Sequence, residues 1–81
     1  MQYRTKVTCS SMINLELDEN HVIKDVSFRG GCNGNLQGIS RLVIGQRAED
    51  VIPKIEGIRC GFKNTSCPDQ LAKALRQAIA E

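Results

Sequence analysis

The chain has 81 residues, 41% hydrophobic and 25% charged, which fits one small globular domain and argues against disorder. A formal net charge of +2, with one tyrosine and two phenylalanines, offers neither a basic run nor a stacking surface, so nucleic-acid binding is not expected. Neither a signal peptide nor an apolar run near the roughly 20 residues that span a bilayer is present, so we expect a cytoplasmic protein with no membrane partner.

Three extended segments are predicted in the first part of the chain. Residues 3–8 and 12–17 alternate between apolar and polar side chains, and residues 22–28 form a third such segment after a polar turn at 18–21. His21 lies in that turn and is interpreted as a solvated residue. The economical arrangement is a three-stranded antiparallel sheet with short loops.

Helical patterns fill the rest of the chain. Apolar residues recur at helical spacing at Leu36, Ile39 and Val43, with Leu42 as a weaker member, and Gly45 suits a C-terminal cap. A second stripe covers residues 48–55, where Pro53 predicts a kink or a break. A third begins near Pro68. The predicted fold class is therefore α/β (α+β): a three-stranded antiparallel sheet followed by two or three helices on one face, in a single domain, residues 1–81.

The four cysteines are predicted to lie at the ends of these elements. None of their spacings is the C-x2-C of zinc fingers and ribbons, so spacing alone is weak evidence for metal. Their placement in loops, outside the apolar stripes, favours metal or redox chemistry in a reducing compartment. A reversible dithiol of Cys60 and Cys67, or inert thiols, are the alternatives. The predicted metal ligands are Cys9, Cys32, Cys60 and Cys67.

Cys67 stands at the start of the last predicted helix. Pro68 suits the first helical position, which would make Cys67 the N-cap, where the helix dipole favours a thiolate. In a rival interpretation Ser66 is the N-cap and Asp69 its capping-box partner. Asp69 could also be a ligand. Both interpretations put Cys67 in the first helical turn.

The string TSCPDQL at residues 65–71, preceded by GIRCG at 57–61, resembles the signature of the TSCPD family. Members of that family are short free-standing proteins or the C-terminal domain of cobalamin-dependent ribonucleotide reductases. The resemblance covers nearly the whole chain, including its cysteines. It implies a partner in the ribonucleotide-reduction machinery of DNA synthesis. The chain is far too small to hold the reductase barrel, so it is not expected to be an enzyme by itself.

A more distant resemblance links the chain to the U-type iron–sulfur scaffold proteins, the IscU/NifU N-terminal fold. Residue by residue, this resemblance implies that Cys9, Cys32 and Cys67 are ligands, and Cys60 is an addition that could supply a fourth. The scaffold's histidine before its third cysteine is replaced by Ser66. Four thiolates suit zinc or an iron–sulfur cluster. The leading expectation is a metal- or cluster-binding module, with a redox accessory protein or a non-catalytic interaction domain as alternatives.

Overall fold

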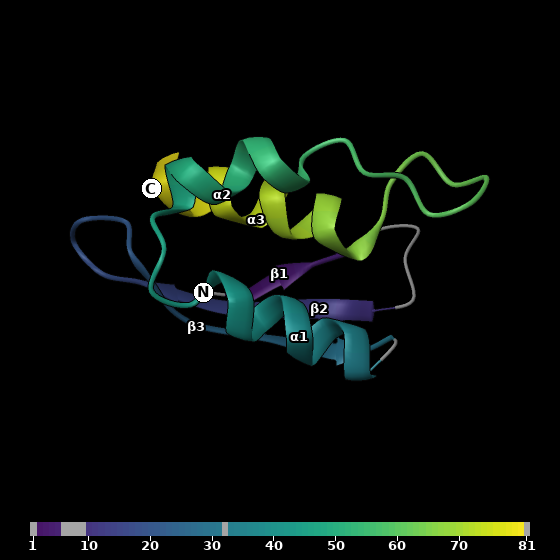
Figure 1. Ribbon diagram of the computed structural model, residues 1–81, viewed down its shortest axis with the longest axis horizontal. Coiled ribbons are helices and arrows are strands. Elements are labelled where there is room, and N and C mark those ends of the chain that lie inside the picture. Colours follow the sequence, from purple (N-terminus) through teal and green to yellow (C-terminus); the bar gives the residue numbers. More distant parts are fainter. Residues whose placement is uncertain (1, 6–9, 32, 81) are drawn as a thin grey trace.

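The computed structural model describes residues 2–5, 10–31 and 33–80 (Figure 1). Three strands precede three helices, which confirms the predicted fold class. The elements are β1 (Gln2–Arg4), β2 (Ser10–Leu17), β3 (Ile23–Gly30), α1 (Asn33–Val43), α2 (Ala48–Ile55) and α3 (Cys67–Ala80). No helix in the described part of the chain is long and apolar enough to cross a membrane.

The sheet has the order β1-β2-β3, and both pairs of neighbouring strands are antiparallel. β2 begins two residues before the predicted segment, because Ser10 pairs with Gly30 and extends both strands. The first predicted strand is confirmed for part of its length, through β1, while residues 6–9 lie outside the described residues. Register shifts near both ends of the β2–β3 pair mark bulges, which twist the sheet.

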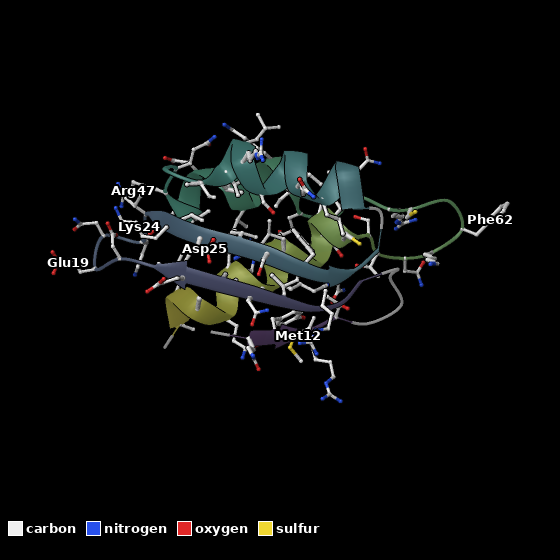
Figure 2. The ribbon with its side chains drawn as sticks, turned by 90° about the horizontal axis from the view of Figure 1, so that it is seen from below. Met12, Glu19, Lys24, Asp25, Arg47 and Phe62 are labelled. Atoms are coloured by element: carbon white, nitrogen blue, oxygen red, sulfur yellow. The ribbon has the colours of Figure 1, made fainter. Side chains whose placement is uncertain are left out.

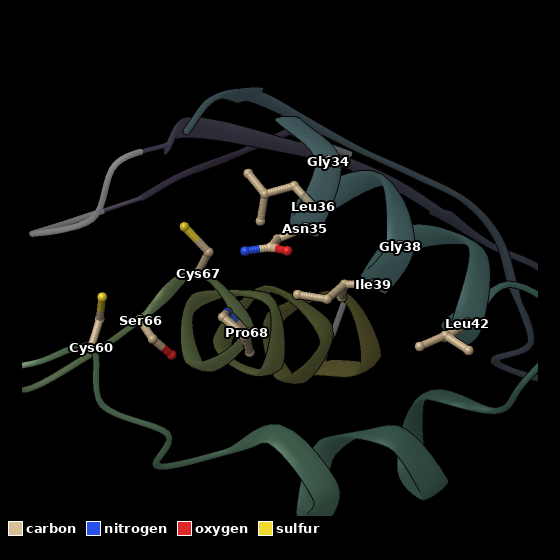
Figure 3. Close-up of a pocket in the computed structure, with 10 residues that line it drawn as sticks. All are labelled: Gly34, Asn35, Leu36, Gly38, Ile39, Leu42, Cys60, Ser66, Cys67 and Pro68. Atoms are coloured by element: carbon tan, nitrogen blue, oxygen red, sulfur yellow. The ribbon is translucent and has the colours of Figure 1, made fainter. Parts of the chain in front are cut away.

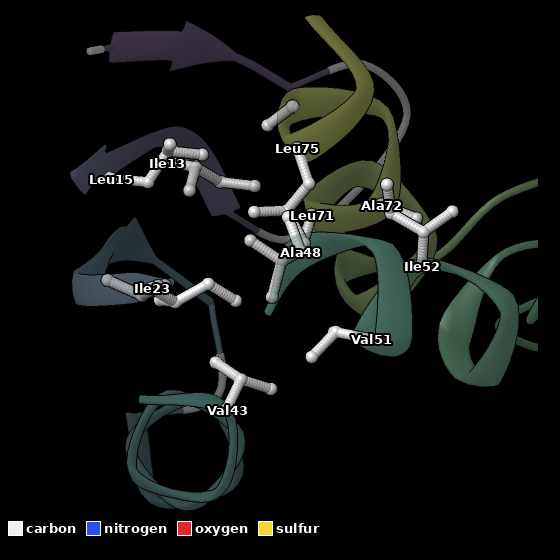
Figure 4. Close-up of a cluster of buried hydrophobic side chains, with 12 residues drawn as sticks. Ile13, Leu15, Ile23, Val43, Ala48, Val51, Ile52, Leu71, Ala72 and Leu75 are labelled. Atoms are coloured by element: carbon white, nitrogen blue, oxygen red, sulfur yellow. The ribbon is translucent and has the colours of Figure 1, made fainter. Parts of the chain in front are cut away.

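One face of the sheet packs against the helices and forms the core (Figure 4). Its alternate residues are apolar and buried, whereas residues such as Glu16 and Ser27 on the other face are exposed. Burying each large aliphatic side chain stabilises the fold by about 1.5–3 kcal/mol. The buried cluster comprises Ile13, Leu15, Ile23, Val26, Val43, Ala48, Val51, Ile52, Leu71, Ala72, Ala74 and Leu75.

The three helices divide into two groups. α1 packs on β3, whereas α2 and α3 pack against each other and α3 also contacts β2. Because α1 stands apart from the other two helices, the side of α1 that carries Leu42 is not covered. Leu42 is 73% exposed, so its predicted membership of the buried stripe is wrong.

α2 runs through Pro53 to Ile55 without a break, which contradicts one of the two predicted outcomes. The proline removes only one N–H donor, and the Glu56 N–H still donates to the Ile52 carbonyl at 2.9 Å. Burial of Ala48, Val51 and Ile52 on the inner face holds the short helix together.

The β2–β3 turn is fastened to the start of α2. His21 has a positive φ of 65°, its carbonyl accepts the Ala48 N–H at 2.8 Å, and its Nδ1 lies 2.6 Å from Glu49 Oε2. The hydrogen bond to His21 lowers the pKa of Glu49 below its usual value. His21 is therefore more than the solvated turn residue that the sequence predicted.

A candidate cysteine site

Cys60 and Cys67 lie at one end of the molecule and line the same pocket (Figure 3). The pocket has a volume of about 480 Å³ and lies between α1, from Gly34 to Leu42, and the start of α3. Its other walls include Gly34 and Asn35 from α1. Cys60 is exposed and Cys67 is half-buried, and the two are thiols rather than a disulfide. The structure thus brings together two of the four predicted ligands.

Cys60 owes its position to a closed loop before α3. Its N–H donates to the Thr65 carbonyl at 3.1 Å, and its carbonyl accepts the Lys63 N–H at 3.0 Å. Gly61 has a φ of 59° at the first central position of this turn, a conformation that glycine adopts without strain. The loop therefore folds back on itself and returns the chain beside Cys60, leaving Phe62 fully exposed at its tip (Figure 2).

Cys67 is the first residue of α3, and Ser66 is its N-cap. The Asp69 N–H donates to Ser66 Oγ at 3.2 Å, and the Gln70 N–H donates to the Ser66 carbonyl at 2.9 Å. The prediction that Cys67 is the N-cap is therefore wrong, because the serine hydroxyl satisfies a first-turn donor directly. The rival interpretation is confirmed for the role of Ser66.

Asp69 is the buried ionisable group of this region, with 3% of its surface exposed. Its carboxylate accepts the Gly57 N–H at 2.7 Å, the Thr65 hydroxyl, and Lys73 Nζ at 3.3 Å. Burial by itself would raise the pKa of Asp69, but the Thr65, Gly57 and Lys73 donors outweigh it and lower the pKa below its usual value. These donors hold the carboxylate, rather than the return hydrogen bond to Ser66 that a full capping box has.

The hydrogen bonds around Asp69 explain why Thr65, Ser66 and Asp69 stand beside Cys67. Gln70 Nε2 also donates to Thr65 Oγ1 at 2.9 Å, so the loop and the first turn of α3 share one network. We call Gly57, Thr65, Asp69, Gln70 and Lys73 the Asp69 network. The sequence analysis did not predict the roles of Gly57, Thr65 and Gln70. The one signal for this network was the spacing of Ser66 and Asp69, which is that of a capping box.

Cys9 and Cys32, the other two predicted ligands, lie outside the described residues. Residues close to them along the chain are described: Ser10, after Cys9, pairs with Gly30 at one end of the sheet, and Gly34, two residues after Cys32, lines the pocket beside Cys67. Within residues 2–5, 10–31 and 33–80, no three His, Cys, Asp or Glu side chains are grouped so as to hold a metal. The four-cysteine site therefore stays a prediction.

Comparison with known proteins gives one finding about the whole chain. Neither the curated proteins nor the solved structures contain a significant match, so the resemblance to U-type scaffold proteins gains no support. The family model of the TSCPD domain, by contrast, matches residues 1–79. The Ser66 N-cap, Cys67 and the buried Asp69 all lie within the string TSCPD, residues 65–69, for which the family is named. The chain belongs to the TSCPD domain family.

Proposed function

We propose that the chain is a metal- or cluster-binding module in which Cys9, Cys32, Cys60 and Cys67 supply thiolate ligands. The observation that carries the proposal is the shared pocket: Cys60 and Cys67 come from a loop and a helix start, yet line one concave surface. Thiolates are the preferred ligands of structural zinc and of iron–sulfur clusters.

The described residues next to Cys9 and Cys32 in the chain support including these two cysteines in the proposed site. Cys9 is joined to Ser10, which pairs with Gly30, and Cys32 is joined to Gly31 and Asn33 at the start of α1. α1 also contributes Gly34 to the pocket that holds Cys67. These chain positions therefore support the proposal that the two cysteines belong to the same site.

The donor chemistry of the described residues fits such a group in part. Two thiols line the pocket, and the carboxylate of the buried Asp69 accepts hydrogen bonds from Gly57 and Thr65. Zinc held by four thiolates would be structural, because no ligand position stays open. An iron–sulfur cluster would supply electron transfer or be delivered to a recipient.

Anaerobic purification followed by metal analysis and visible absorption tests the proposal. One zinc per chain, or iron and sulfide with absorption from a cluster, is the expected result, and each of the four Cys→Ser variants should lower the metal content. Cys60→Ser is the most informative variant, because Cys60 is exposed and supports no part of the core. Metal-free protein with all four thiols reactive would overturn the proposal.

A second candidate function is thiol–disulfide exchange between Cys60 and Cys67. It is favoured by the observation that both residues are thiols and line one pocket. Disulfide formation would bring their Cα atoms within about 7 Å of each other. Metal-free protein that forms a Cys60–Cys67 disulfide reversibly would select this function, and mass spectrometry after alkylation reads it out. Slow alkylation without metal would leave an interaction domain.

We also propose the ribonucleotide-reduction machinery as partner, on the strength of the family resemblance given by the TSCPD string. Under this proposal the chain is an accessory module rather than the enzyme. Co-purification with a reductase from the same cell, lost in Cys60→Ser and Cys67→Ser, is the expected outcome. Reductase activity that is unchanged on adding or removing the protein would contradict it.

A further inference from the structure

The cysteine pocket continues along α1 into a second hollow of about 200 Å³. Ile39 and Leu42 line both hollows, so the two form one groove, which we call the α1–α2 groove. Figure 3 shows these two side chains projecting from α1 into it. Beyond Leu42 the facing wall is α2, which contributes Val51, Lys54 and Ile55. The groove therefore runs along α1 from the cysteine end to α2.

The groove is a mainly apolar surface that the described part of the chain leaves uncovered. Leu42 is 73% exposed where the two hollows meet, and Ile39 beside it is half-buried. Gly34 and Gly38 line the same side of α1, and a Cβ at Gly38 would meet no atom within 4 Å. A partner can therefore approach the backbone of α1 closely. Exposed apolar surfaces with a polar rim mark binding sites for other proteins.

The walls of the groove determine the kind of segment that it can hold. α1 and α2 pair their backbone groups within their own turns, so the groove presents side chains rather than a strand edge. An occupant must then satisfy its own backbone donors and acceptors, which a helix does. α1 rises about 12 Å from Gly34 to Leu42, so a helix of about three turns covers the groove. Its contacts would recur at positions i, i+3, i+4 and i+7.

Both ends of the groove carry basic side chains. Lys54 lines one end, and no carboxylate among the described residues forms an ion pair with it. Asp50, one turn earlier on α2, lies outside the lining. At the other end Arg59 precedes Cys60, and the Lys63 N–H donates to the Cys60 carbonyl at 3.0 Å, so two more exposed cations flank the exposed thiol. These positions complement a segment with carboxylates near both of its ends.

We propose that the α1–α2 groove binds an acidic amphipathic helix of a partner protein. The apolar stripe of that helix packs on Ile39 and Leu42 and over Gly38. Its terminal carboxylates pair with Lys54 at one end and with the cations beside Cys60 at the other. Ile39, Leu42 and Lys54 are not among the proposed metal ligands. The inference therefore goes beyond metal binding and does not rest on it.

A second copy of the chain fits the groove less well than an acidic helix. The walls at the cysteine end come from α1 and residues 57–68, which contain no Asp or Glu. Joining two such surfaces would bring cations against cations, and like charges across an interface weaken binding. The charge of the groove therefore favours a different, acidic chain.

Fluorescence anisotropy of labelled peptides, with the full-length protein as purified, tests the proposal. The probe fluorescein-EELAQLLQALEE-amide has its leucines on one helical face and glutamates at both ends, and it should bind saturably. The isomer fluorescein-EELQLALQLAEE-amide has the leucine alternation of a strand and should bind about tenfold more weakly. The charge-reversed fluorescein-KKLAQLLQALKK-amide should bind about fivefold more weakly, near the upper limit for one exposed ion pair. Added salt should reduce this last difference.

Two pairs of variants locate the site. Leu42→Ala should weaken binding of the glutamate probe about tenfold, whereas Ile44→Ala, which truncates an exposed apolar side chain outside the groove, should not. Lys54→Gln should remove most of the preference for glutamate over lysine. Arg41→Gln, which removes a cation on the β3 side of α1, should leave that preference unchanged. All four side chains are exposed, so the variants should fold, and circular dichroism checks this.

Four results would overturn the proposal. Absence of saturable binding, or equal affinity for the two leucine patterns, would mean that the groove does not hold a helix. Equal affinity for the glutamate and lysine probes would remove the acidic partner. Equal effects of Leu42→Ala and Ile44→Ala would place the peptide elsewhere on the molecule. A molecular mass by light scattering that doubles with concentration in the wild type, but not in Leu42→Ala, would show that a second copy occupies the groove.

Discussion

The apolar core and the cysteine end are held together by different forces. The core is stabilised by the burial of aliphatic side chains from the sheet, α2 and α3. Leu71 and Leu75 are wholly buried there. At the cysteine end, hydrogen bonds around Asp69 hold a loop that leaves Cys60 and Phe62 exposed. Burial of apolar side chains therefore stabilises the core, while the loop with its thiols depends on a few polar contacts.

Of the variants considered, Leu71→Ala should lower the free energy of unfolding the most, because it alters the apolar core. Leu71 has no exposed surface, and its truncation leaves a cavity that costs about 2–5 kcal/mol of the free energy of unfolding. Because small domains have only about 5–15 kcal/mol in total, the variant should be close to unfolding. Urea denaturation followed by circular dichroism measures the loss. Leu42→Ala, which truncates an exposed apolar side chain, is the control. A smaller loss of stability in Leu71→Ala than in Leu42→Ala would contradict the burial of Leu71.

At the cysteine end, Asp69→Asn should cause the largest loss in the free energy of unfolding. The asparagine keeps the shape but loses the charge that accepts the Gly57, Thr65 and Lys73 donors, and its amide turns one acceptor into a donor. Hydrogen bonds to a charged group contribute about 1.5–3 kcal/mol, so a loss near 2 kcal/mol is expected in urea denaturation.

Glu56→Gln is the matched control for Asp69→Asn. Glu56 pairs with Arg76 through two hydrogen bonds, but both side chains are well exposed, so the variant should lose no more than about 1 kcal/mol. Equal losses in the two variants would mean that burial does not distinguish Asp69. The rate of Cys60 alkylation should rise in Asp69→Asn and stay unchanged in Glu56→Gln, because Asp69 accepts hydrogen bonds from Gly57 and Thr65 on either side of Cys60, whereas Glu56 pairs with Arg76.

The contribution of Asp69 should depend on pH in a defined direction. Its pKa in the folded protein lies below the ordinary value of 3.8, so its stabilisation is fully present above that value. The stabilisation is lost as the pH falls through the lower folded pKa. The difference in unfolding free energy between wild type and Asp69→Asn should therefore be constant near neutral pH and shrink in acid. A difference that grows as the pH falls would mean that burial dominates the pKa.

The sequence predicted the core better than the cysteine end, for physical reasons. Alternation and helical spacing report which side chains avoid water. They predicted the strand at residues 12–17 and the helix that begins near Pro68, which contain the buried Ile13, Leu15, Leu71 and Leu75. The Asp69 network joins Gly57 to Asp69 across a loop, and no periodicity encodes such a contact. The exposure of Leu42 followed from the distance between α1 and the other helices, which only the tertiary structure determines.

Ser66→Ala should sharpen the assignment of the N-cap. The variant removes the acceptor of the Asp69 N–H, and loss of a serine N-cap costs about 1 kcal/mol. Cys67→Ala should cost less, because Cys67 is the first helical residue and its side chain lies at the pocket rather than in the core. Thermal denaturation of both metal-free variants measures the order. A larger loss of stability in Cys67→Ala than in Ser66→Ala would indicate that Cys67, not Ser66, is the N-cap.

Gly38→Ala has the smallest expected effect and separates stability from function at the pocket. Gly38 lies inside α1, and a Cβ there would meet no atom within 4 Å. Alanine favours a helix over glycine by about 0.5–1 kcal/mol, so the variant should be slightly more stable than wild type. Gly38 also lines the pocket of Cys60 and Cys67, so the added methyl group would occupy part of the surface offered to a protein partner such as the proposed reductase.

If the reductase contacts this surface, Gly38→Ala should be more stable and should bind the reductase more weakly, with its metal content unchanged. A variant that gains stability and keeps full binding would mean that the open side of α1 is not part of the functional surface.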